Sequence, residues 1–305
     1  MPPRLTRPQR AVVAAALAER HGGVVHRADL RAEGVTREDV RTEVRAGRWS
    51  MAGRHTVVIG GSTPQGEGLL WRAVWESGSG AVLDGASSLL ASGLTGFTTD
   101  RIWVCVPRSS RAYPVEGVVL TRRRVVTPAP RGGVPRTDVD VATIRAAQWA
   151  VSDRQAALLV CLPIQQRLTA PMRLLEAWRL VRRSRRRSVL DQVIRDVCDG
   201  AHSLGDLDFA VMCRRRGLPE PRRQVLVEQS GRVYLDVEFD GGLVVEIDGG
   251  HHARALAPVD DALRQNSLTL TRRLVLRIPV LGLRLQQDAF MDQIAEGLTV
   301  AASAA

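Results

Sequence analysis

Apolar positions in the first sixty residues repeat with a helical period that glycine interrupts. Residues 9–20 place four apolar side chains on one face, and residues 26–32 fit a second helix after the turn "HGG". Beyond Gly34, "TRED" from Thr36 has the form of a capping box that begins a third helix. "MAGRHTVVI" then indicates a turn and a short strand. Three short helices followed by a β-element predict a winged helix over residues 1–62.

The third predicted helix is rich in arginine. Its basic side chains are Arg37, Arg41, Arg45 and Arg48. In a winged helix the third helix faces the major groove of DNA, so these four side chains are candidate DNA contacts. A small helical cap whose arginines are only solvated has the same outline.

The segment from residue 63 to residue 200 mixes helices with short strands. Its start lies within "GGSTPQGEG", residues 60–68, which is a linker by composition. "AVLDGASSLLASGL" predicts a helix of small residues, and "RIWVCVP" and "GVVLTRRR" predict strands. Residues 158–187 are rich in helix formers and end in "RRSRRR", which is either a solvated surface or a contact for phosphates. No catalytic constellation is visible in this segment.

The last segment, residues 201–305, predicts an α-β-β-β-α-β order. A helix with apolar residues at helical spacing is expected over residues 205–216. Three strand signals follow, "RQVLVE", "RVYLDVEF" and "GLVVEID", with a turn at 240–242 between the last two. A helix over 258–271 leads into a final strand, "LVLRIPV". The whole chain is therefore expected to be α/β (α+β), with domains at 1–62, 63–200 and 201–305.

Two carboxylates are expected to face each other in this last segment. A three-residue loop at 240–242 pairs Phe239 with Leu243, and therefore Asp236 with Glu246. Directly opposed Cβ atoms lie about 4.5 to 5.5 Å apart, so the two acids can share one divalent cation. Magnesium suits such a site because it prefers hard oxygen ligands. An edge hairpin whose carboxylates are solvated or paired to arginines is the structural alternative.

These residues carry a family resemblance. The segment over about 201–290 resembles the PD-(D/E)XK nuclease core, and more closely its Vsr-like endonuclease branch, in two groups of residues: Asp236, Glu246, Asp248 and His252, then Asp261, Arg264 and Leu268. The first segment is similar, more weakly, to the winged-helix part of AbiEi-like type IV antitoxins. The resemblance implies a restriction-endonuclease-like core after a winged helix and an AbiEi-like middle domain.

The resemblance also implies a division of roles. Asp236 and Glu246 hold Mg²⁺ (or Mn²⁺), with help from the Ile247 carbonyl, and Asp206 supports the metal through water. Asp248 or His252 positions the attacking water or protonates the leaving oxygen.

Two positions depart from the family pattern. Asp248 stands where the motif has lysine, and Asp206 stands where the branch usually has glutamate. Arg264 is the best replacement for the missing electrophile by reach and charge. A zinc site built on His251 and His252 is a further alternative, although no Cys or His partner has supporting spacing.

Charge favours a polyanionic partner. The net charge is +11, and every basic position is arginine, because the chain contains no lysine. Nucleic acid is the first candidate partner, and a merely soluble basic surface is the alternative.

The absence of an apolar run of about 18 residues argues against a membrane span. Four scattered cysteines without a C-x-x-C pair, and a basic start without a signal-peptide core, predict a cytoplasmic protein with reduced thiols.

The sequence therefore leads to two functions of different classes. One is a Mg²⁺-dependent DNA endonuclease or nickase with an N-terminal DNA-binding module. The other is a DNA-binding transcriptional regulator or antitoxin whose nuclease-like domain has lost activity. DNA is the expected partner in both, and a toxin or repair protein is a possible second partner.

Overall fold

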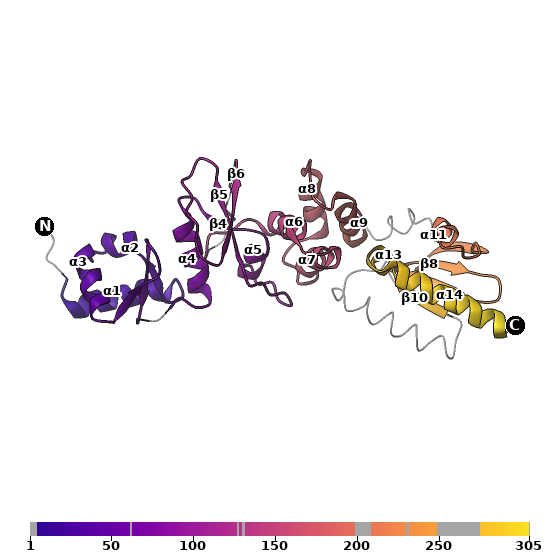
Figure 1. Ribbon diagram of the computed structural model, residues 1–305, viewed down its shortest axis with the longest axis horizontal. Coiled ribbons are helices and arrows are strands. Elements are labelled where there is room, and N and C mark those ends of the chain that lie inside the picture. Colours follow the sequence, from indigo (N-terminus) through magenta and orange to yellow (C-terminus); the bar gives the residue numbers. More distant parts are fainter. Residues whose placement is uncertain are drawn as a thin grey trace. The chain divides into compact units, whose positions relative to one another are not determined.

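The computed structural model describes residues 5–61, 63–126, 128–129, 132–198, 209–229, 232–248 and 275–304. At 223–229, 232–234, 236, 248 and 304 only the backbone is described. The chain divides into two compact units, Met1–Ala142 and Thr143–Ala305. Both contain helices and small sheets, so the fold belongs to the mixed α/β class (Figure 1). Over the described residues, no helix has both the length and the apolarity needed to cross a membrane.

The first unit begins with three helices and a three-stranded antiparallel sheet of order β1-β3-β2. The elements are α1 (Arg7–Glu19), β1 (Val24–His26), α2 (Arg27–Ala32), α3 (Arg37–Arg45), β2 (Trp49–Met51) and β3 (Thr56–Ile59). The predicted capping box is confirmed: the Thr36 hydroxyl accepts the Asp39 N–H, and the Asp39 carboxylate accepts the Thr36 N–H at 3.0 Å. His26 ends a strand that the sequence did not predict, and its Nδ1 accepts the Ala28 N–H at the start of α2.

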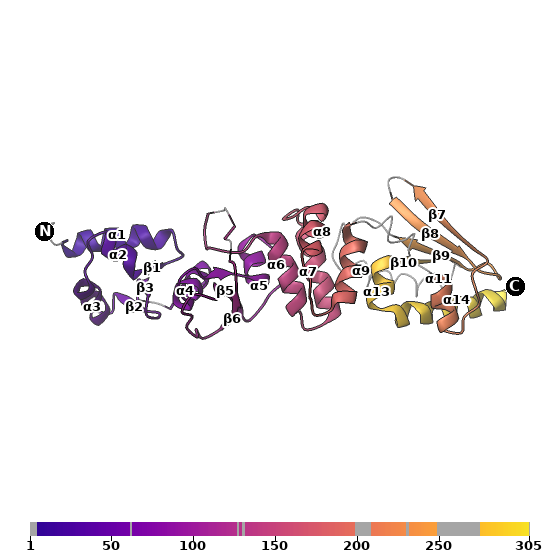
Figure 2. The same ribbon diagram turned by 90° about the horizontal axis from the view of Figure 1, so that it is seen from above.

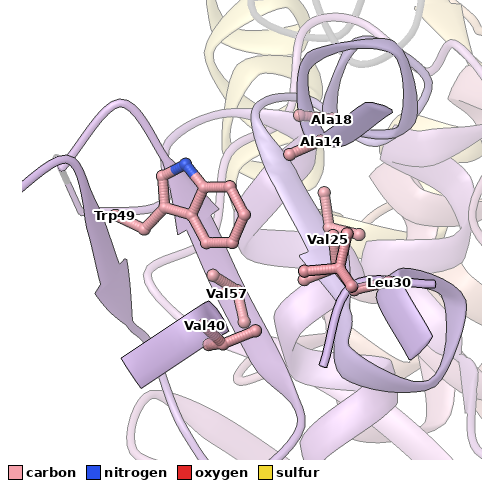
Figure 3. Close-up of a cluster of buried hydrophobic side chains, with 8 residues drawn as sticks. Ala14, Ala18, Val25, Leu30, Val40, Trp49 and Val57 are labelled. Carbon is pink, nitrogen blue, oxygen red and sulfur yellow. The ribbon is translucent and has the colours of Figure 1, made fainter. Parts of the chain in front are cut away.

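A hydrophobic cluster holds these six elements together. Figure 3 shows Trp49 and Val57 from the sheet directed toward Val40 of α3, with the alanines of α1 and Leu30 of α2 nearby. The cluster consists of Ala14, Ala18, Val25, Leu30, Val35, Val40, Trp49 and Val57, all 5% exposed or less. Each fully buried large apolar side chain contributes about 1.5 to 3 kcal/mol to folding.

Buried ion pairs join α1 to α3. The Arg10 guanidinium lies 3.2 Å from Asp39 and 3.1 Å from Glu43, and both carboxylates are buried. Glu43 also accepts from Arg48 at 2.5 Å, and that hydrogen bond is the largest cause that lowers the pKa of Glu43. α3 ends at Arg45, so Arg48 lies beyond the helix, after Gly47 with φ of 69°. Arg48 is therefore a structural ion-pair partner, in contrast to its predicted place on the helix.

The same unit continues with α4 (Glu67–Ser77), β4 (Val82–Leu83), α5 (Gly85–Ala91), β5 (Ile102–Pro107) and β6 (Val118–Arg123). β5 lies between β4, which is antiparallel to it, and β6, which is parallel to it. The predicted strands are confirmed. The predicted boundary at residue 62 lies inside this unit, because α4 contacts both the β1–β3 sheet and the second sheet.

Glu76 of α4 fixes the turn between β2 and β3. Its buried carboxylate accepts the backbone N–H groups of Arg54 (2.7 Å), His55 (2.7 Å) and Thr56 (2.8 Å). A Cβ atom at Gly53 would lie 2.4 Å from the Glu76 side chain, so glycine is required there. A buried carboxylate that accepts several N–H bonds is well compensated for its lost hydration.

α6 (Val139–Trp149) runs across the boundary between the units. The second unit then holds α7 (Asp153–Gln165), α8 (Pro171–Arg179), α9 (Arg187–Cys198), α11 (Phe209–Arg215), β7 (Arg223–Gln229), β8 (Arg232–Glu238), β9 (Val244–Asp248), β10 (Val275–Pro279), α13 (Val280–Leu285) and α14 (Gln287–Ala304). The four strands form one sheet of order β10-β9-β8-β7 (Figure 2). The four predicted strands are confirmed; the predicted helix 258–271 and the start of helix 205–216 lie outside the described residues.

One set of alternating positions in the sheet forms the core of this part of the chain. Leu235 pairs with Ile247, which pairs with Ile278; Val237 pairs with Val245, which pairs with Leu276. All six are 5% exposed or less. Phe239 continues the apolar set after β8 and meets the ring of Phe209 in α11 edge-on, with centroids 6.5 Å apart.

Asp196 of α9 and Arg284 of α13 join the helical and sheet parts of the second unit. The Arg284 Nε lies 3.4 Å from the buried Asp196 carboxylate. Burial raises the pKa of Asp196 to about 6, against the opposing effect of Arg284. A carboxyl whose pKa is raised by folding binds its proton more tightly in the folded state, so ionising it destabilises the fold.

We expect the Asp196→Asn variant to show a weaker loss of stability with rising pH. In the wild type this group lowers the unfolding free energy as pH rises from 3.8 toward about 6. The loss is on the order of 3 kcal/mol, from about 1.4 kcal/mol per unit. Urea unfolding at a series of pH values measures it. Asp288→Asn, which changes an exposed carboxylate, is the control, and equal pH profiles in all three proteins would contradict the assignment.

A second prediction separates the structural arginine from its exposed neighbours. Arg48→Ala removes a charged hydrogen bond to the buried Glu43 carboxylate and should destabilise the first unit by on the order of 1 to 2 kcal/mol. Arg45→Ala changes a side chain that is 77% exposed. It should stay within about 0.5 kcal/mol of the wild type. Denaturant titrations of the two variants decide the matter, and equal losses would count against the structural role of Arg48.

Candidate functional site

The β8–β9 hairpin has the register that the sequence predicts. The Phe239 N–H donates to the Leu243 carbonyl at 2.9 Å, and the turn uses Gly241 and Gly242 at φ of 93° and 89°. Positive φ at two successive positions favours glycine. Asp236 is therefore paired directly with Glu246, as the loop length implied.

Sheet register extends this pair into a row of three charged residues. Glu246 of β9 is the parallel partner of Arg277 in β10, so the row reads Asp236, Glu246, Arg277 across three strands. These positions alternate with the buried apolar rows, and the Arg277 side chain is 71% exposed. Because successive strand residues alternate between the two faces of a sheet, the Glu246 and Arg277 positions lie on the face opposite the core.

The Glu246 carboxylate and the Arg277 guanidinium form an ion pair. The Arg277 Nε donates to Glu246 Oε2 at 2.8 Å, and the Glu246 side chain is 30% exposed. Arg277 was not among the predicted site residues, although its strand was. The signal that identifies it is the parallel register of β10 on β9, which no connecting turn encodes.

The remaining predicted nuclease residues are described in part or not at all. Asp236 and Asp248 are described in backbone only, two rows apart in the sheet, with Asp248 opposite Tyr234. Asp206, His252 and Arg264 lie outside the described residues. Ile247 is buried in β9 between Glu246 and Asp248. Within the part of the chain that is described, no cluster of three or more His, Cys, Asp or Glu side chains is suited to a metal.

The predicted DNA-contacting helix presents three of its four arginines to solvent. Arg37, Arg41 and Arg45 are exposed and recur every four residues, which places them along one face of α3. Glu38 lies among them, 3.3 Å from Arg41 and 3.9 Å from Arg45. Exposed pairs of this kind are worth about 0 to 1 kcal/mol, so Glu38 competes weakly with a phosphate for these guanidinium groups.

A pocket lined by charged and aromatic residues lies beside the β2–β3 turn. Its volume is about 260 Å³, and Arg54, Arg72, Tyr113 and Glu116 are among its lining residues. The Arg54 and Arg111 guanidinium groups lie 5.8 Å and 5.4 Å from the Tyr113 ring centroid. Arg72 donates to the Ala52 carbonyl at 2.7 Å and so helps Glu76 to hold the turn. No local pattern in the sequence predicts this pocket, because it forms between segments far apart in the chain.

Comparison with known proteins leaves the family open. No protein-family model matches the chain, and no curated protein matches it. Among solved structures, the crystal structure of the RV2827C protein from Mycobacterium tuberculosis is similar, with 17% sequence identity and a TM-score of 0.39. That alignment covers 67% of this chain and 78% of the other. Similarity at this level does not establish a shared fold or function.

Proposed function

We propose that this protein is a metal-dependent DNA endonuclease or nickase with an N-terminal DNA-binding module. The observation that carries the proposal is the pairing of Asp236 with Glu246 on adjacent strands, with Arg277 next in the row. The β-β-β order, the parallel fourth strand and the resemblance to the Vsr-like branch of PD-(D/E)XK nucleases support it. Under this proposal the sheet of the second unit is the restriction-endonuclease-like core.

Mg²⁺ or Mn²⁺ suits the acids of this row. Two opposed carboxylates offer hard oxygen ligands, and unshared they would repel each other. In the proposed site Asp236 and Glu246 would hold the ion, the Ile247 carbonyl would add a ligand, and Asp206 would support the ion through water. When bound, the ion lowers the pKa of water and neutralises charge that develops on the phosphate.

The chain itself supplies the remaining groups of the proposed mechanism. Asp248 or His252 positions the attacking water or protonates the leaving oxygen. A guanidinium takes the place of the family's lysine and stabilises the phosphate as its negative charge grows. Arg264 is one candidate for that role by the resemblance. Arg277 is a second candidate, because its guanidinium lies 2.8 Å from Glu246.

DNA binding is assigned to the first unit. Its three helices and antiparallel sheet are compatible with a winged helix, and α3 presents Arg37, Arg41 and Arg45 on one exposed face. Arginine recognises phosphate and guanine edges through two parallel N–H groups, which suits a helix in the major groove.

A regulator or antitoxin with an inactive nuclease-like domain is the second candidate. The observation that favours it is the Glu246–Arg277 ion pair, since a cation beside a metal ligand can also replace the metal. Such a protein would bind DNA through the first unit and use the sheet only as a scaffold, or as a contact for a toxin or repair protein.

Cleavage assays on plasmid DNA test the enzyme directly. We expect nicking or cutting with Mg²⁺ or Mn²⁺, and none in EDTA. Losing an outer-shell partner of a metal typically costs about 10- to 100-fold. Asp236→Asn and Glu246→Gln remove direct ligands, so each should reduce the cleavage rate by more than that. Glu238→Gln, on the same strand, is the matched control and should cleave normally. Wild-type rates in both acid variants would leave the proposed site without support and favour the regulator.

The two candidate electrophiles are separated by a pair of alanine variants. The residue that acts on the transition state should lose about 10²- to 10³-fold in cleavage rate as alanine, with a much smaller change in DNA affinity. We expect this loss of cleavage rate for Arg277→Ala and a smaller loss for Arg264→Ala. Arg277→Lys should recover part of the rate. Single-turnover rates and binding in EDTA give the two readouts.

The opposite results are also informative. Faster cleavage by Arg277→Ala at lower Mg²⁺ would mean that the guanidinium competes with the metal, which would return the electrophilic role to Arg264. Wild-type rates in both alanine variants would remove both arginines from the mechanism.

A further inference from the structure

The loop between α8 and α9 concentrates positive charge on the second unit. Residues 182–187 read "RRSRRR", and no acidic residue occurs from there until Asp191. The loop joins the end of α8 at Arg179 to the start of α9 at Arg187. Five arginines in six residues repel one another, so each needs a partner anion or full solvation.

Two of these arginines anchor the loop. Arg186 adopts a left-handed backbone with φ of 56°, pairs with Asp153 at the start of α7, and donates to the Ala150 carbonyl at 2.9 Å. Arg187 pairs with Asp191 at 3.0 Å and lies over the Trp178 ring at 4.6 Å. It also donates to the Val181 carbonyl, directly before Arg182. These contacts use the carboxylates of Asp153 and Asp191 and hold both ends of the loop.

The other three arginines are exposed. Arg182, Arg183 and Arg185 extend into solvent, and none makes an ion pair with another described residue. The three guanidinium groups therefore form a cationic surface on a loop whose ends are held in place. We call Arg182, Arg183 and Arg185 the arginine loop.

We infer that the arginine loop is a second DNA-backbone contact, separate from α3, that binds the phosphates of duplex DNA. The inference rests on the proposed function for the identity of its partner. Duplex DNA carries one negative charge per about 1.7 Å of axis, so a segment about 10 Å long meets several phosphates at once. Arginine suits them because its fork donates two parallel hydrogen bonds to one phosphate. No base reading is implied, since phosphate contacts position a protein without specifying sequence.

The position of the loop places this contact away from the acid row. Asp196, which joins α9 to α13, lies nine residues after Arg187, or about 14 Å along the helix. α13 directly follows β10, the strand that carries Arg277. DNA held at the arginine loop is therefore DNA that flanks the site of cleavage, and the contact supplies affinity without chemistry.

Salt dependence of DNA binding tests the inference. Binding of the full chain to a 20-bp duplex is measured in EDTA over a series of salt concentrations. We expect the variant R182A/R183A/R185A to show a slope of log affinity against log salt that is shallower by about 2 to 3, or about 0.9 for each lost phosphate contact. The variant with lysine at all three positions keeps the charge and should keep the slope.

A matched control removes the same charge elsewhere in the unit. R195A/R215A/R222A changes three exposed arginines outside the loop and should leave the slope near the wild-type value. Equal changes in the control and loop variants would overturn the inference, because only net charge would then matter. A wild-type slope in the loop variant would overturn it as well. So would loss of binding to phosphatidylserine vesicles with an unchanged DNA slope, which would indicate a membrane partner.

Cleavage with Mg²⁺ separates this inference from the proposed enzyme. If the wild type cleaves no DNA but the loop variant still has the shallower slope, the endonuclease fails and the arginine loop stands. If the loop variant cleaves DNA and binds with the wild-type slope, the loop fails and the endonuclease stands. R37A/R41A/R45A in α3 should lower the slope independently, because the two surfaces lie on different units.

Discussion

The strict alternation of side chains across β8, β9 and β10 is the constraint on which the candidate site depends. Six core residues of these strands are buried in two rows, and each contributes about 1.5 to 3 kcal/mol. A slip of one residue in either pairing would move a strand's apolar side chains to the opposite face. The core therefore fixes the register of Asp236, Glu246 and Arg277, and the repulsion of two acids is too small to change it.

Local sequence signals made much of the fold and of the candidate site predictable. The capping box at Thr36, the strands and the three-residue turn depend on neighbouring residues, and the turn alone fixes which acid faces Asp236. Contacts between distant segments were not predictable. The parallel pairing that places Arg277 beside Glu246 has no connecting turn to set its register. The hydrogen bonds from the β2–β3 turn to Glu76 join segments about 20 residues apart, on either side of the predicted linker at 60–68.

The arginine-only composition gives these cations two kinds of role. Arg10, Arg48 and Arg284 neutralise buried carboxylates, and Arg186 and Arg187 anchor a loop. Breaking a buried pair leaves an uncompensated charge, so Arg10, Arg48 and Arg284 are committed to the fold. The count of 43 arginines therefore overstates the number of cations that are available to a polyanion. The exposed arginines of α3 and of the arginine loop are among those that a nucleic acid can reach.

The strength of the Glu246–Arg277 ion pair decides whether it favours an active nuclease or an inactive nuclease-like domain. Arg277 is 71% exposed and Glu246 is 30% exposed, so the pair lies at the surface of the sheet. Surface ion pairs are worth about 0 to 1 kcal/mol, whereas a bound metal ion supplies several kcal/mol to a phosphoryl transition state. The guanidinium can therefore leave Glu246 for a phosphate oxygen at little cost when a metal and DNA arrive. The ion pair by itself is thus compatible with an active site.

The stronger argument for an inactive domain is the absence of lysine from the chain. Arg277 weakens that argument as well, because it places a permanent cation beside one of the two paired acids.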